Sequence, residues 1–308
     1  MTQTSCSSAE ARPRLSRSRR ADRVRQPLLG SVVIPAHNEA RTIGRGLDAL
    51  FTGFAPAELE VVVVCNGCTD GTAAVVRSFG HGLRVVELAV ASKPAALRVG
   101  DAAATAFPRL YLDADVVLPG SAARRVLERL RDDAIAARPP ILYDSRGSSA
   151  LVRSYYRARS RVPAVMGSLW GAGVYGLSEA GRRRFGSFPD LVADDLWVDR
   201  HFESAEVEIV DCRPVSVVAP QRSRDLVRIL RRVYFGKGEA TSRPDQGGPG
   251  RNTVGSTVRD LSRLAVAGPA ALLDAATYAA FAAGARLALS LGSLPGEGWG
   301  RDDSSRSG

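Results

Sequence analysis

Short apolar runs alternate with longer amphipathic segments along the chain from about residue 29. The apolar runs, rich in β-branched residues, are 31–35, 59–64, 83–88 and 110–112. The segments between them repeat apolar residues at the spacing of a helix, as in Ile43, Leu47 and Leu50. Strands and helices in strict alternation predict an α/β fold with a mostly parallel sheet covered by helices on both faces. Ligands of such sheets bind at the carboxyl ends of the strands.

The alternation becomes less regular after residue 130. Weaker strand candidates are 141–143, 174–177 and 208–210. Residues 224–234 place leucine, valine and tyrosine on one side of a predicted helix and arginines on the other. We therefore expect the second half to continue the sheet with more loops.

The C-terminal part divides into a linker, an apolar segment and a tail. Glycine and proline in 244–252 predict a flexible linker, which we place at 236–256. The alanine-rich segment 257–293 is interrupted by Asp274 and Arg286, so its longest uncharged run is shorter than the ~18 residues of a spanning helix. It predicts one or two helices that pack on the core or lie in a membrane interface. Residues 294–308 predict a disordered tail.

The N-terminal segment carries much of the positive charge. The chain has 42 Lys and Arg against 32 Asp and Glu, a net charge of +10. Arginines crowd residues 12–25, and so few large apolar residues accompany them that 1–28 predicts a disordered arm. Anionic lipid headgroups are the more specific candidate partner of this arm. No aromatic residue interleaves with these arginines, so we expect no nucleic-acid partner.

The chain predicts a cytoplasmic protein, with peripheral attachment to the cytoplasmic face of a membrane as a further expectation. Its N-terminus shows no apolar stretch of the kind found in secretory signals. Four cysteines in 308 residues do not suggest a disulfide framework.

Two carboxylates interrupt the apolar run 111–118. Asp113 and Asp115 would point to the same face if both lay on a strand. Converging carboxylates favour Mg²⁺ or Mn²⁺, which also bind phosphate oxygens. The alternative is a turn before Pro119.

The segment 64–72 holds a Cys-x-x-Cys pair between a predicted strand and a predicted helix. Cys65 and Cys68 could form a thiol redox site, because a helix N-terminus stabilises a thiolate. The turn pair Asn66-Gly67 and the capping residues that follow favour a structural loop instead. One pair also offers too few ligands for a structural zinc.

Four motifs in order resemble those of family 2 glycosyltransferases of the GT-A fold. They are VIPAHNE at 33–39, NGCTDGT at 66–72, KPAAL at 93–97 and LDAD at 112–115. The resemblance extends over 31–235 and implies a catalytic domain at 29–235, whose nucleotide-binding half ends near residue 118. It also implies a UDP- or GDP-linked sugar donor, Mg²⁺ or Mn²⁺, and inverting transfer to a hydroxyl of a lipid-linked or glycan acceptor.

The resemblance assigns roles residue by residue. Pro35, His37 and Glu39 would line the nucleoside pocket, Asn66 would contact the base, Lys93 would place the nucleotide, Asp113 would hold ribose or metal, and Asp115 would bind the metal. The family more often has Asp-Asp-Gly-Ser where this chain has Cys65-Asn66-Gly67-Cys68, which leaves the nucleobase open.

The second half supplies a candidate base. Attack by a hydroxyl on a sugar needs a general base on the face opposite the leaving group. Asp194 and Asp195 resemble the acidic pair of the family, and the preceding loop, Trp170, Gly171, Ala172 and Gly173, resembles its acceptor loop. Asp195 takes the position of the base. The alternative is that the pair caps a helix.

Arg231 and Arg232 resemble in position an arginine segment near the donor pyrophosphate. They would clamp a phosphate, or else form the solvated face of a helix. The Gln-x-x-Arg-Trp signature of processive synthases is absent after Gln221, which favours transfer of a single sugar. A non-catalytic nucleotide-binding or membrane-associated module of the same fold is the alternative function.

Overall fold

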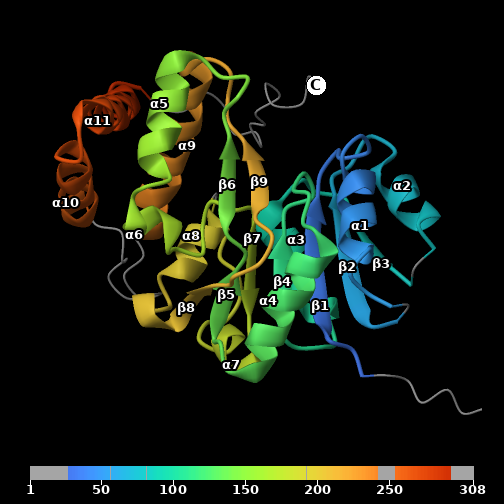
Figure 1. Ribbon diagram of the computed structural model, residues 1–308. Helices are drawn as coiled ribbons and strands as arrows, with labels where there is room; N and C mark the ends of the chain where they lie inside the picture. Colours follow the sequence, from blue (N-terminus) through green and yellow to red (C-terminus); the bar gives the residue numbers. More distant parts are fainter. Residues whose placement is uncertain (1–26, 56, 81, 192, 242–253, 293–308) are drawn as a thin grey trace, which may run out of the picture.

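One sheet with helices on both faces forms the body of the molecule, and a group of helices packs at one end of it (Figure 1). The computed structural model describes residues 27–55, 57–80, 82–191, 193–241 and 254–292. Residues 1–26 of the predicted arm and all of the predicted tail thus lie outside the described residues. The sheet has seven strands in the order β3-β2-β1-β4-β7-β5-β8. The predicted α/β class with a mostly parallel sheet is confirmed.

The first four strands are parallel and agree closely with the predicted runs. They are β1 (Gly30–Ala36), β2 (Leu59–Asn66), β3 (Arg84–Leu88) and β4 (Arg109–Leu112). β7 (Val174–Leu177) lies antiparallel between β4 and β5 (Ala136–Arg138), and β8 (Val207–Ile209) is parallel to β5. β6 (Ile141–Asp144) and β9 (Val215–Val218) form a separate parallel pair rather than extending the main sheet.

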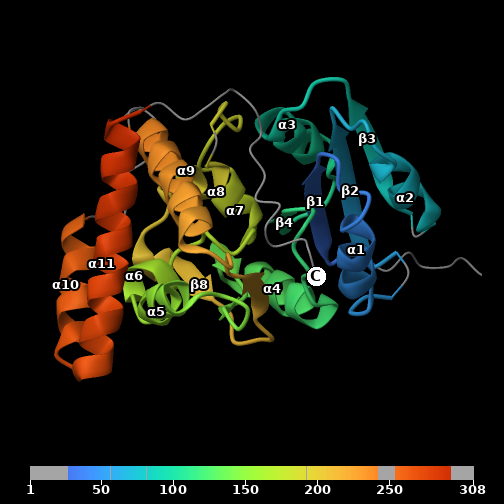
Figure 2. The same cartoon turned by 90° about the horizontal axis from the view of Figure 1, so that it is seen from above.

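The helices cover both faces of the main sheet. Their bounds are α1 Ile43–Phe51, α2 Thr72–Ser78, α3 Lys93–Ala103, α4 Gly120–Asp132, α5 Ala150–Arg159, α6 Pro163–Met166, α7 Glu179–Arg182, α8 Asp194–Asp199, α9 Ser223–Thr241, α10 Val254–Ala265 and α11 Pro269–Ser290, with a short 3₁₀ turn at Ser204–Glu206. Val61 and Val63 pack with α1, α2 and α4, whereas Val62 and Val64 pack with α3. Successive residues of a strand face opposite sides, so β2 is an unbroken valine run because both of its faces are buried. Figure 2 shows α3 on one side of the sheet and α1 and α4 on the other.

A third apolar core joins α5, α9, α10 and α11. Val152, Leu226, Leu264 and Ala275 are buried in it. α9 continues to Thr241 and α10 begins at Val254, so the linker expected at 236–256 is wrong at both ends. The remaining residues of that linker, 242–253, lie outside the described residues.

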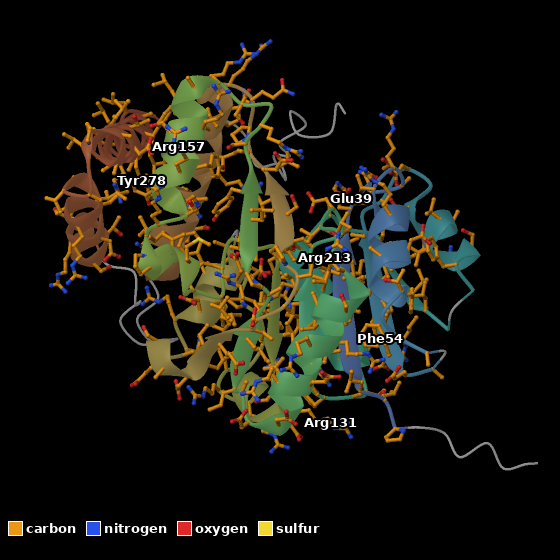
Figure 3. All side chains as sticks on the ribbon, viewed as in Figure 1. Glu39, Phe54, Arg131, Arg157, Arg213 and Tyr278 are labelled. Carbon is orange, nitrogen blue, oxygen red and sulfur yellow. The ribbon has the colours of Figure 1, made fainter. Side chains whose placement is uncertain are left out.

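α11 is long and apolar enough to cross a membrane by length and composition, and it is the one helix of this kind in the described part of the chain. It packs against α5 and α9 here. Its buried Asp274 accepts a hydrogen bond from Ser154 (2.6 Å) and pairs with Arg157 (2.6 Å) on α5. Figure 3 places Arg157 and Tyr278 at this helix contact.

Candidate active site

The antiparallel pairing of β4 with β7 brings Asp113 to the glycine-rich loop. The Asp113 N–H donates to the carbonyl of Gly173 (2.8 Å), directly beyond the last pair of the ladder. β4 ends at Leu112, and the Val116 N–H donates back to the Asp113 carbonyl (3.0 Å). Asp113 and Asp115 therefore lie in a turn, and the expectation that a strand aims them at one face is wrong. Asp115 is exposed.

Gly173 has no room for a side chain. Its φ is +66°, and a Cβ would lie 2.5 Å from Val116 Cγ2 and 3.4 Å from Asp113 Oδ2. Only glycine combines this backbone conformation with such a close approach. The loop thus reaches the Asp113 carboxylate because residue 173 is a glycine.

Lys93 joins the two halves of the domain electrostatically. Its Nζ lies 2.8 Å from Asp113 Oδ1 and 2.8 Å from Asp194 Oδ1. Burial opposes the charge of Lys93, but the carboxylates of Asp113 and Asp194 outweigh it and raise the pKa of the ammonium. Lys93 is the first residue of α3, where the side chain of Ser92 caps the helix.

Asp194 and Asp195 begin α8, and burial disfavours the charged form of both side chains. Asp195 accepts from the N–H of Gly171 at Oδ2 (2.9 Å) and from the N–H of Leu196 at Oδ1 (2.8 Å). Burial raises the pKa of both carboxyls, and Lys93 opposes that shift. The N-cap is Ala193, with no side-chain cap, so the capping alternative for the pair is not realised.

One pocket collects residues from both halves. Its lining is Pro35, Lys93, Leu97, Tyr111, Leu112, Asp113, Gly173, Tyr175, Asp194 and Asp195. Tyr111 and Tyr175 stack at 5.0 Å between ring centroids, and the Tyr175 hydroxyl donates to Asp194 (3.3 Å). Sequence reasoning missed both tyrosines. The one available signal was their place in predicted strands beside the motifs.

The pocket edge fits a metal that a substrate helps to bind. Among the described residues no group of three His, Cys, Asp or Glu is placed to hold a metal. The side chain of Asp113 is 38% exposed and Asp115 is exposed in the adjoining turn. One or two carboxylates completed by phosphate oxygens are the usual protein contribution to a Mg²⁺ site. The residues present fit that kind of site and not an all-protein cage.

Comparison with protein families finds a match for 141 of the 308 residues. Residues 31–171 match the model described as Glycosyl transferase family 2. These residues belong to glycosyl transferase family 2. The resemblance drawn from the four motifs and the expectation of a glycosyltransferase are thereby confirmed.

Solved structures share the fold of the family 2 domain. Mannosyltransferase PcManGT from Pyrobaculum calidifontis, in complex with GDP-Man and Mn²⁺, is 23% identical, with a TM-score of 0.56 over 84% of this chain and 80% of that one. Glucosyl-3-phosphoglycerate synthase from Mycobacterium tuberculosis, with Mg²⁺ and UDP, is 20% identical (TM-score 0.50; 71% and 79% covered). S. aureus TarS 1-349, with UDP-GlcNAc, is 14% identical (TM-score 0.50; 84% and 91% covered). The search of curated proteins found no match.

Of the residues predicted to line the nucleoside pocket, Pro35 lines the pocket described above, whereas His37 and Glu39, with the predicted base contact Asn66, have partners within the protein. Asn66 is fully buried, donates from its amide to the Ala36 carbonyl (2.8 Å) and accepts from the Ser92 N–H (3.0 Å). His37 Nδ1 lies 2.6 Å from the Asn66 carbonyl oxygen. Glu39 is buried in the segment just before α1 and is labelled in Figure 3. None of the three lines the pocket found in the described residues.

The cysteine pair does not have the properties of a redox site. Cys65 is buried in the sheet core, and burial raises the pKa of its thiol to about 12. Reactive cysteines have lowered thiol pKa values. Cys68 Sγ lies 3.5 Å from the Ala36 carbonyl oxygen, so the pair belongs to the packing of the loop.

The remaining predicted residues are not part of the pocket lining. Trp170 is partly buried and Ala172 is buried in the loop that holds Asp195. Arg231 donates to the Gly292 carbonyl (3.4 Å), and Arg232 is exposed on the same helix. Neither arginine lines the pocket.

Proposed function

We propose that this chain transfers a single sugar from a nucleoside diphosphate donor to an acceptor hydroxyl by inverting displacement. The observation that carries the proposal is the pocket in which Lys93 and Asp113 of the first half meet Asp194 and Asp195 of the second. Every one of these residues was singled out by a family motif, although the motifs are far apart in sequence.

Asp195 is the proposed general base. Backbone N–H groups of Gly171 and Leu196 hold one oxygen each, which fixes the orientation of the carboxylate. Burial raises its pKa, and a carboxylate with a raised pKa is a better proton acceptor near neutral pH. The hydroxyl proton passes to Asp195 as the acceptor oxygen bonds to the anomeric carbon and the bond to the diphosphate breaks.

Asp115 and Asp113 are the proposed ligands of Mg²⁺ or Mn²⁺. When bound, the ion supplies positive charge beside the leaving diphosphate. Two of the similar structures were solved with these ions, which supports the choice. Lys93 keeps the neighbouring carboxylates in place.

We further propose a cytoplasmic enzyme that rests on a membrane surface. Large apolar side chains are exposed on α10 and α11 and directly after each helix, namely Val258, Val266, Leu272, Leu273, Leu287 and Leu291. An apolar face of this kind suits a membrane interface. It also suits a lipid-linked acceptor.

Replacement of the base tests the mechanism. We expect Asp195→Asn to lower sugar transfer at least about a hundredfold, the scale of general-base catalysis, with folding and nucleotide binding retained. Asp190→Asn is the matched control, because Asp190 is 75% exposed and pairs only at the surface with Arg98. Equal transfer by the Asp195 variant would exclude Asp195 as the base. No transfer by the wild type with any donor would favour the non-catalytic module.

A further inference from the structure

The Arg159 guanidinium has no acidic partner in the described part of the chain, and it lies next to the loop that holds the proposed base. It ends α5 and is partly buried. Its Nε donates to the Tyr143 hydroxyl (2.9 Å), and the guanidinium lies 5.3 Å from the ring centre of Trp170. Within the described ranges its two Nη groups make no hydrogen bond or ion pair. They leave four N–H donors unused.

The guanidinium faces the acceptor loop. Its Nη2 lies 3.5 Å from the position that a Cβ on Gly171 would occupy. The N–H of Gly171 is one of the two donors to Asp195. The Arg159 cation and the Asp195 carboxylate that would take the acceptor proton thus both lie beside Gly171.

The surroundings of Arg159 offer donors and aromatic rings rather than acceptors with charge. Burial lowers the pKa of the Arg159 guanidinium, but the hydroxyls of Tyr143, Tyr155, Tyr156 and Tyr278 outweigh it and raise that pKa. The guanidinium of Arg138 is a further cation close enough to interact with Arg159. The Tyr155 side chain is 1% exposed, and no residue in the described part of the chain hydrogen-bonds its hydroxyl. A buried polar group without a partner is costly, so such groups normally meet a ligand or water.

We propose that Arg159, with the Tyr155 hydroxyl, binds an oxyanion of the acceptor substrate. An arginine fork presents paired N–H donors in the geometry of phosphate or carboxylate oxygens, and the Tyr155 O–H adds a further donor. The acceptor would thus carry a phosphate or a carboxylate near the hydroxyl that receives the sugar. This inference rests on the proposed transferase function and names its acceptor class.

Calorimetric titration of the full chain with inorganic phosphate tests the site, with sodium acetate as the carboxylate probe and sodium chloride at equal ionic strength as the reference. We expect saturable phosphate or acetate binding, and the tighter of the two identifies the acceptor group. Arg159→Gln should weaken it at least about tenfold and Tyr155→Phe less, since charged hydrogen bonds are the stronger ones. Arg161→Gln, an exposed arginine two residues away, should bind as the wild type does.

Arg159→Lys keeps the positive charge and loses the paired N–H donors of the guanidinium. Its affinity for the anion should therefore lie between those of the wild type and Arg159→Gln. It also tests the site if Arg159→Gln folds poorly. UDP and GDP should not displace the bound anion. The proposal would be overturned if the wild type bound neither anion, if both Arg159 variants bound the anion as tightly as the wild type does, or if nucleotide displaced the anion. Sugar transfer by a wild type that binds no anion would overturn the acceptor site while leaving the proposed function intact.

Discussion

At the scale of single residues, Lys93 determines the charge balance of the pocket. It is 21% exposed at the side chain, whereas its partner Asp194 is 4% exposed. A buried carboxylate that loses its cation destabilises the fold much more than a surface pair does. The lysine therefore has a structural task besides any contact with nucleotide.

Lys93→Met should lower the free energy of unfolding by about 3–5 kcal/mol at neutral pH. The deficit should shrink as the pH falls, because Asp194, with its pKa already raised by burial, becomes neutral by binding a proton. Urea unfolding at pH 5 and pH 8 measures both effects. The exposed pair Arg77–Glu87 gives the control: Arg77→Gln should cost less than about 1 kcal/mol. A Lys93 variant as stable as this control would contradict the account.

The pH profile of transfer reports the proposed base. Burial raises the pKa of Asp195, so the carboxylate should protonate at a higher pH than the ~3.9 of an ordinary aspartate. Transfer should thus decline as the pH falls through that raised pKa, and kcat/KM measured against pH should show an acidic limb above the ordinary value of an aspartate. A limb at the ordinary value would mean that Asp195 is not the group that titrates.

At the scale of elements, the junction of β4, β7 and α8 builds the site. β7 is antiparallel to β4, so its preceding loop reaches the end of β4 where Asp113 lies. The order of motifs in the sequence predicted the parallel strands β1 to β4 and the residues after them. It could not reveal that β7 inserts between β4 and β5, because pairing of a four-residue strand depends on contacts distant in sequence.

Gly173→Ala tests this junction. A methyl group would lie 2.5 Å from Val116 Cγ2 at a φ of +66°, so we expect a loss of stability of about 1–3 kcal/mol and weaker transfer. Gly186→Ala is the control, since nothing lies within 4 Å of its Cβ position and its φ is not in the left-handed region. Thermal unfolding of the two variants measures the difference. Equal melting temperatures would show that the loop has room to move.

Side-chain roles were less predictable than elements. The strand argument for Asp113 and Asp115 failed because β4 ends at Leu112, before either aspartate. Asn66 has its amide committed to Ala36 and Ser92, which spacing alone cannot show. The pairing of Lys93 with Asp194 spans a hundred residues and followed from neither motif.

At the scale of the whole molecule, the sheet bears the pocket and the helical group at its end bears the exposed leucines (Figure 2). Lys and Arg exceed Asp and Glu by 42 to 32, which favours anionic lipid surfaces. The alanine-rich composition predicted helices here. Whether their outer face contacts lipid depends on an interaction outside the chain.

Co-sedimentation with vesicles of phosphatidylglycerol and phosphatidylcholine measures that contact. The wild type should bind, and Leu272→Glu with Leu273→Glu should reduce binding severalfold, because the substitutions place negative charge on the apolar face of α11. Leu142→Glu is the control, because Leu142 is 57% exposed on β6, away from α11. Binding unchanged by the double variant would place the lipid contact elsewhere.

The most direct test of the central claim is nucleoside diphosphate release from a panel of UDP- and GDP-sugars, with and without Mn²⁺ or Mg²⁺. The account predicts release from at least one donor, dependent on the metal, and loss of that release in a folded Asp115→Ala variant. Release that needs no metal, or that persists in Asp115→Ala, would contradict the assignment of the pocket edge as the site of the donor diphosphate.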